Sequence, residues 1–186
     1  MEENKHFENS RNIIKELISE GRISKAKHGS VNFFMKKASE SIAVSSRLLK
    51  LEDEEELATS MWVINTSYYA MFFAATALLA KYNHQIKTDA GIHKLTYHAI
   101  VYYFVFDDNK LEKHFIEQYK DAVEEAEELL QLSEKKTSTM ISDLNNELVK
   151  RKRFTYDLGE IAEKKKAKTS FERAKSFVKE IELMLK

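Results

Sequence analysis

The absence of proline from all 186 residues is the feature that most limits how this chain can fold. Proline and glycine favour tight turns, and the chain has only four glycines. Alanine, leucine, glutamate and lysine, which favour helices, are abundant instead. We therefore expect long helices joined by few turns, in one domain with a sizeable core.

Apolar residues recur at helical spacing along several segments. Residues 9–20 form the first segment, which stops at Gly21. Residues 30–50 form the next, with Ser30 as the expected N-cap and with Phe33 and Phe34 among the expected core residues. Further helices are expected over residues 57–82, 88–105 and 110–155, and a last one from about Ser170, after a polar connection.

This pattern predicts an all-α fold, an up-and-down helical bundle with four core helices and an N-terminal helical extension. Residues 1–29 are assigned to the extension, and residues 30–186 to the bundle domain. Residues 57–80 carry no formal charge and are long enough to span a bilayer, but they include many polar side chains. We interpret them as a central bundle helix, with Tyr68 and Tyr69 packed in the core, and we expect no membrane partner.

Cysteine is absent, which excludes disulfides, thiolate metal sites and a cysteine nucleophile. The polar, acidic start of the sequence does not resemble a signal peptide, so a cytoplasmic location is expected. The six histidines show no spacing typical of a helical metal site, and the sequence contains no glycine-rich phosphate loop. No metal and no cofactor are therefore expected.

The formal net charge is zero, but the charge is unevenly placed. Residues 107–134 hold ten acidic and three basic side chains, whereas residues 150–186 hold twelve basic and six acidic ones. Within the basic part, Arg151 falls on the apolar stripe of its own predicted helix. A buried unpaired arginine is costly, so Arg151 is expected to pair across the bundle, to join a dimer seam or to line a cleft.

Three pieces of the sequence occur in the order and spacing of a known motif set. They are "SYYAMFFAATALL" at residues 67–79, "KTDAGI" at residues 87–92 and the stretch from Arg151 to Tyr156. Together they resemble the small prokaryotic branch of the HEPN domain family, whose helix reads close to S-Y-Y-A-M-F-H-A-A-R-A-L-L. The resemblance covers about residues 35–186.

The resemblance implies an up-and-down bundle that often forms a homodimer. Many members of the family are RNA-cleaving toxins or defence ribonucleases, and others pair with a small nucleotidyltransferase as toxin and antitoxin. The nuclease branch uses an arginine followed by a histidine, and Arg151 matches that arginine. The histidine is replaced by Tyr156, and the other motif positions hold Phe73, Thr76 and Asp89. Tyrosine is a poor base at neutral pH because its ordinary pKa is about 10.

These features predict a HEPN-like protein that binds RNA or a partner nucleotidyltransferase in a toxin–antitoxin or defence context. The expected ligand residues are Arg151, Arg153, Tyr156 and Asp157, with phosphate contacts from the arginines. A first alternative is a metal-independent endoribonuclease with a degenerate Arg-x4-Tyr site, in which Arg151 and Tyr156 are the catalytic candidates. A second alternative is a purely structural or interaction subunit.

Overall fold

The fold is an all-α bundle, as the sequence predicts. The computed structural model describes residues 2–54, 58–88, 91–106, 111–126 and 157–186. Its helices are α1 (Glu2–Ser19), α2 (Ser30–Glu54), α3 (Ser60–Lys81), α4 (Ile92–Val101) with the π-helical turn η1 (Tyr102–Phe106), and α6 (Asp157–Met184). Residues 113–126 are also helical. Two short strands, β1 (Ile23–Ser24) and β2 (Gln85–Ile86), pair antiparallel.

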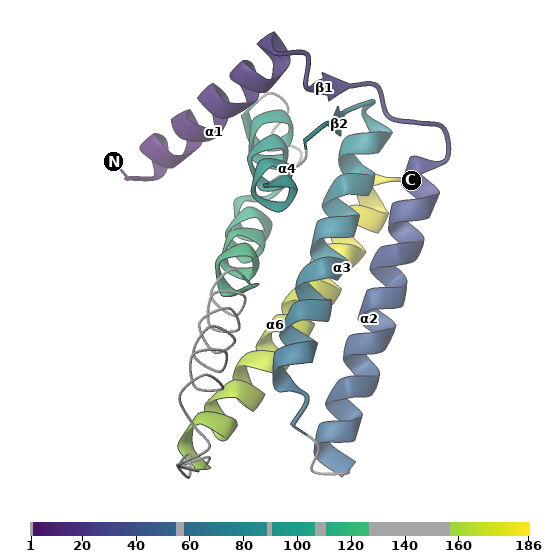
Figure 1. Cartoon of the computed structure of the whole chain (residues 1–186), viewed down its shortest axis with the longest axis vertical. Coiled ribbons are helices and arrows are strands. Elements are labelled where there is room, and N and C mark those ends of the chain that lie inside the picture. Colours follow the sequence, from purple (N-terminus) through teal and green to yellow (C-terminus); the bar gives the residue numbers. More distant parts are fainter. Residues whose placement is uncertain (1, 55–57, 89–90, 107–110, 127–156) are drawn as a thin grey trace, which may run out of the picture.

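Helix α3 is the central element of the bundle. It packs against α2 on one side and against α6 on another, and α2 and α3 run side by side along most of the molecule (Figure 1). By length and composition α3 could cross a membrane, but 72% of its most apolar window is buried inside the protein. Its alanines explain this close packing, because Ala70, Ala74 and Ala77 are fully buried and let neighbouring helices approach. The uncharged run is therefore the core helix of the bundle.

Hydroxyl groups fix the point at which α3 begins. Thr59, the N-cap residue, donates from Oγ1 to the carbonyl oxygen of Leu48 in α2, at 2.7 Å. Ser60 donates from Oγ to Oε1 of the buried Glu52, at 2.6 Å. A carboxylate is favourable there because the N-terminus of a helix carries partial positive charge. The start of α3 is thus bonded to the last turns of α2.

Helix α1 shares the main core with the rest of the bundle. Ile14 and Leu17 are buried in the same apolar cluster as residues of α3 and α6. Ser10 Oγ lies 2.9 Å from His98 Nδ1, and both residues are buried, so a polar contact also joins α1 to α4. The division between extension and bundle after residue 29 stays a prediction, but the two parts pack together.

Two predictions about individual elements are wrong. The last helix begins at Asp157 and not near Ser170, so the supposed polar connection is helical. Its glutamates, lysines and alanines favour a helix, but it lacks the apolar periodicity that marks a core segment, and Ala167 makes its packing contact. Phe33 is exposed rather than part of the core, whereas Phe34 is half-buried.

The hydroxyl of Tyr119 gives a first testable prediction. Tyr119 is fully buried against Phe177 and Tyr97, and its hydroxyl has no hydrogen-bond partner among the residues that the structure describes. A buried polar group without a partner destabilises the fold, so Tyr119→Phe is expected to raise the free energy of unfolding by about 1 kcal/mol. Denaturant unfolding measures this change. Tyr119→Leu, which also removes the ring, should lower it, and a loss of stability in Tyr119→Phe would contradict the prediction.

Candidate functional site

The structure does not place the predicted site as a whole. Arg151, Arg153 and Tyr156 lie outside the described residues, and Asp157 is the first residue of α6. The ligand and catalytic roles assigned to these four residues therefore stay predictions.

The described part of α6 near this segment carries a basic run. Lys164 Nζ lies 2.7 Å from Asp53 Oδ1 at the end of α2, and Lys168 Nζ lies 3.7 Å from the same oxygen. The hydrogen bond from Lys164 lowers the pKa of Asp53 below its ordinary value. Lys165 and Lys166 are exposed. The basic run is thus partly neutralised by α2 and partly open to solvent.

A groove between residues 113–126 and α6 lies beside these lysines, with a volume of about 470 Å³. Among its lining residues, Glu125 accepts from Arg173 at 3.3 Å, and Glu125 also accepts from the neighbouring Ser170 of α6 at 2.7 Å. Arg173 also approaches Asp121 at 3.9 Å. Because both charge signs meet inside the groove, it is better suited to joining the two helices than to binding a charged ligand.

The most prominent surface feature is a row of aromatic side chains on α2 and α3. Phe33, Trp62 and Tyr69 are 56%, 57% and 43% exposed, which is unusual for such large rings. Ring contacts connect most of the row: Phe33 to Phe34 at 5.2 Å, Phe34 to Phe73 at 6.4 Å and Phe73 to Tyr69 at 5.9 Å between centroids. We call these residues (Phe33, Phe34, Trp62, Tyr69 and Phe73) the aromatic face.

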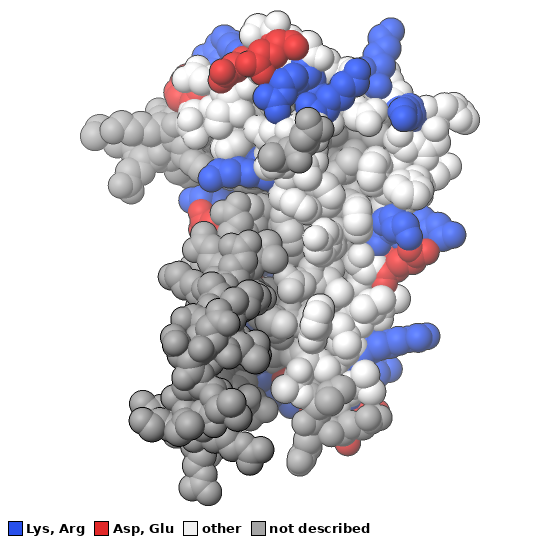
Figure 2. Space-filling model, in the orientation of Figure 1, with Lys and Arg blue, Asp and Glu red and all other residues white. Residues whose placement is uncertain are grey.

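The aromatic face lies on a surface to which α3 contributes no charge. Residues 58–80 contain no acidic or basic side chain. Figure 2 shows the result as a pale band along the molecule, with charged side chains at its ends and along one edge. On α2, Lys36 and Lys37 follow Phe33 by three and four residues and pair with Glu40.

Polar and aromatic contacts beneath the aromatic face hold it in place. Thr66 Oγ1 donates to the carbonyl oxygen of Trp62 at 2.8 Å and lies 2.6 Å from Ser45 Oγ of α2. On the other side, the His93 ring of α4 lies 5.5 Å from the Tyr69 ring and 4.3 Å from the Phe72 ring. The face is therefore a supported surface, built on three helices.

The two adjacent tyrosines of α3 have different roles. Tyr68 is buried, as predicted, but Tyr69 is exposed, so the prediction that both pack in the core is wrong for Tyr69. Residues one position apart point about 100° apart around a helix, and in α3 that rotation moves the ring from the core to the surface. The exposure of Trp62 and Phe33 could not be read from the sequence either, because an apolar side chain is expected in the core unless the packing of neighbouring helices is known.

In the HEPN motif that the sequence resembles, two of the positions that fall on α3 are polar. Phe73 occupies one and packs in the aromatic face, and Thr76 occupies the other and donates to the carbonyl oxygen of Phe72 at 2.8 Å. In the described part of the chain, no three His, Asp or Glu side chains gather in a way that would hold a metal ion.

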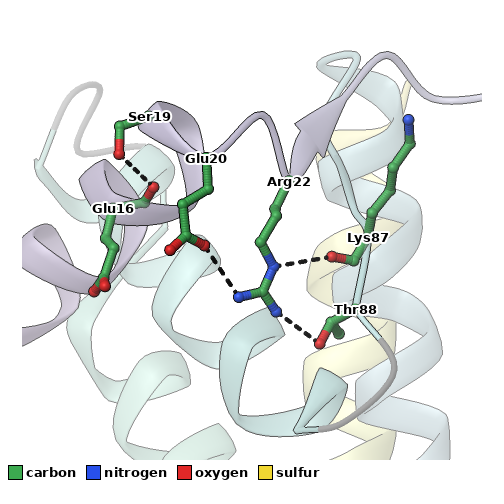
Figure 3. A network of polar contacts seen from close by, with 6 residues as sticks. All are labelled: Glu16, Ser19, Glu20, Arg22, Lys87 and Thr88. Carbon is green, nitrogen blue, oxygen red and sulfur yellow. Dashed lines mark hydrogen bonds and ion pairs between the residues drawn. The ribbon is translucent and has the colours of Figure 1, made fainter.

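The sequence also contains an Arg-x5-His pattern, Arg22 to His28, which lies outside the three pieces that carry the family resemblance. Figure 3 shows that Arg22 is held by several contacts: it donates to Thr88 Oγ1 at 2.9 Å, to Glu20 Oε2 at 3.2 Å and to the carbonyl oxygen of Lys87 at 3.4 Å. Arg22 therefore joins the end of α1 to the segment after β2. Its contacts give it a structural role.

At the same end of the bundle the His84 ring stacks on the Tyr103 ring, with centroids 3.8 Å apart. Burial lowers the pKa of His84, so its neutral form is favoured.

A scan against models of known protein families finds no match, and a search of curated proteins finds none either, so the resemblance to the HEPN family stays a prediction.

Proposed function

We propose that the protein functions by binding, as a homodimer joined through the aromatic face that engages RNA through residues 151–157. The observation that carries this proposal is the exposure of Phe33, Trp62 and Tyr69 on a face where α3 has no charged residue. Monomeric proteins rarely expose contiguous apolar surface of this kind, and aromatic side chains are enriched where proteins bind one another. The aromatic face is thus a surface for a protein partner.

A second copy of the chain fits this surface best. A two-fold dimer brings the same patch of each copy together, so the patch must be complementary to itself. An uncharged aromatic face meets this condition without repulsion. On α2 both charge signs follow Phe33, with Lys36 and Lys37 beside Glu40, so a symmetric pairing can place opposite charges together. The formal net charge of zero adds no long-range repulsion between copies.

RNA is the ligand that the basic segment favours. Residues 150–153 are all basic, and the exposed Lys165 and Lys166 follow on α6. Lysine and arginine bind phosphate groups, and arginine does so with two parallel hydrogen bonds. The resemblance to the HEPN family supports the same ligand. A dimer would present two such segments to one RNA, which increases the overall affinity.

Arg151→Ala is expected to weaken RNA binding about tenfold to hundredfold, because hydrogen bonds to charged groups contribute about 1.5–3 kcal/mol each. Fluorescence polarisation with a labelled single-stranded RNA at low salt measures the affinity. Arg47→Ala is the matched control, since Arg47 is an exposed arginine on α2 outside the proposed site.

Two results would overturn the RNA proposal: no binding of any RNA by the wild type, or equal affinity of the wild type and Arg151→Ala. The RNA should be recovered intact. Cleavage that is lost in Arg151→Ala and retained with a chelator would favour the endoribonuclease instead. A wild-type chain that stays monomeric would mean that another protein covers the aromatic face, and a nucleotidyltransferase would then be the first partner to test.

A further inference from the structure

Two segments that contain no acidic residue meet at one end of the bundle, where β1 pairs with β2. Residues 21–39 hold five basic side chains and no acidic one, and residues 58–88 hold two basic side chains and no acidic one. The strands join them: Ile23 pairs with Ile86, and Ser24 pairs with Gln85. The backbone N–H of Lys87 also donates to the carbonyl oxygen of Arg22 at 2.8 Å. The fold therefore concentrates positive charge from distant parts of the sequence.

The basic side chains at this end are Arg22, Lys25, Lys27, Lys81 and Lys87, which we call the basic end. Figure 2 shows several Lys and Arg side chains at this end of the molecule, with acidic side chains next to some of them. Arg22 pairs with Glu20 at 3.2 Å. Lys81 donates to the carbonyl oxygen of Leu185, an uncharged acceptor, so this bond does not neutralise the positive charge of Lys81.

The other three lysines of the basic end carry the argument. Lys25, Lys27 and Lys87 are exposed, and within the described ranges none of them forms an ion pair. Lysines of α6 differ, since Lys168 pairs with Asp53 and Lys175 pairs with Glu172. Uncompensated charges close together attract a polyanion, because its counterions are released when the lysines replace them.

We propose that the basic end is a second contact surface for the phosphate backbone of RNA, separate from residues 151–157. This inference rests on the proposed RNA-binding function and states which RNAs that function favours. Contacts from flexible lysines to phosphates carry no sequence information, so the basic end strengthens binding without selecting a sequence.

The start of α6, which directly follows residues 151–156 in the chain, and the basic end lie at opposite ends of the bundle. Helix α6 begins at Asp157, beside residues 151–156 in the chain, and has 28 residues, so it is about 42 Å long at about 1.5 Å per residue. The bond from Lys81 Nζ to the carbonyl oxygen of Leu185, at 2.7 Å, places the far end of α6 beside the basic end. At a rise of about 3.4 Å per nucleotide, about 12 nucleotides are needed to span α6 from Asp157 to the basic end.

The test measures how tightly the full chain binds labelled single-stranded RNAs of about 6 and about 20 nucleotides. At about 3.4 Å per nucleotide, the short RNA cannot span α6 and the long RNA can. The variant Lys25→Gln/Lys27→Gln is expected to bind the long RNA about tenfold more weakly and the short RNA as well as the wild type does. For the long RNA, the slope of log affinity against log salt should fall by about 1.4, at about 0.7 for each lost contact to a single strand. Lys168→Gln/Lys175→Gln is the control, because it removes two lysines that are already in ion pairs. It should leave the affinity for the long RNA and its salt dependence nearly unchanged.

The outcomes separate this inference from the proposed function. If Arg151→Ala loses affinity while Lys25→Gln/Lys27→Gln binds long RNA like the wild type, the basic end is overturned and the proposed function stands. If only the lysine variant loses affinity, the basic end stands and residues 151–157 are not the binding segment. Absence of RNA binding by the wild type overturns both. Lysine-dependent binding to anionic phosphatidylserine vesicles, with RNA binding unchanged, would assign the basic end to a membrane surface and overturn the inference.

Discussion

Trp62→Glu is expected to convert the dimer into a monomer. Trp62 is the most exposed ring of the aromatic face, at 57%, and the proposed interface buries it. A carboxylate in its place would lose its hydration on association, which costs several kcal/mol unless the charge finds a partner. A two-fold interface contains the change twice, so we expect the dimer dissociation constant to rise by at least about a thousandfold, since about 1.4 kcal/mol is a factor of ten. Sedimentation velocity over a range of concentrations measures this shift.

Leu183→Glu provides the matched control for this experiment. Leu183 is an exposed apolar residue of α6, at 53%, and it does not belong to the aromatic face. The dimer should survive the same charge at that position. Trp62 is also the only tryptophan, so its emission reports its own burial directly. A wild-type spectrum that does not shift on dilution, or equal dissociation of both variants, would show that the aromatic face is not the dimer interface.

Ile14→Ala is expected to lower the free energy of unfolding by about 2–4 kcal/mol. Ile14 is fully buried in the main core, although it lies in the segment that the sequence assigns to an extension. Removing part of a buried side chain loses apolar contacts and leaves a cavity that the surrounding helices fill only in part. Urea unfolding followed by circular dichroism measures the loss.

Ile18→Ala is the control, because Ile18 lies one turn further along α1 and is 46% exposed. Ile18→Ala should lower the free energy of unfolding by less than about 0.5 kcal/mol, as is usual for surface substitutions. Equal effects of the two substitutions would show that α1 does not depend on the core. A small effect at both positions would support the division after residue 29.

Much of the fold could be predicted from the sequence. The lack of proline and the helical spacing of apolar residues predict an all-α bundle, and the uncharged run of residues 57–80 predicts its central helix. These inferences succeed because helix propensity and amphipathic spacing are local properties. The start of α6 at Asp157 was missed because propensity alone, without an apolar stripe, extends that helix over polar residues.

The surface features could not be predicted in the same way. Tyr68 and Tyr69 are adjacent and chemically identical, yet one lies in the core and the other on the aromatic face. Which side of α3 stays exposed depends on where α2, α4 and α6 pack, and no local pattern records that. The contacts of Arg22 with Lys87 and Thr88 are visible only once residues 65 and 66 positions apart in the chain meet.

The helical class, the core helix α3 and the absence of cysteine chemistry follow from the sequence alone, because they depend on residue types and their spacing. The prediction that Arg151 and its neighbours bind a ligand rests on the resemblance to a known family and stays a prediction. The tertiary arrangement sets which apolar residues remain exposed, how α1 joins the core and how the segment of Lys25 pairs with the segment of Lys87 through β1 and β2. Those features depend on contacts between distant segments, and burial and local charge density are properties of the folded arrangement rather than of any stretch of the chain.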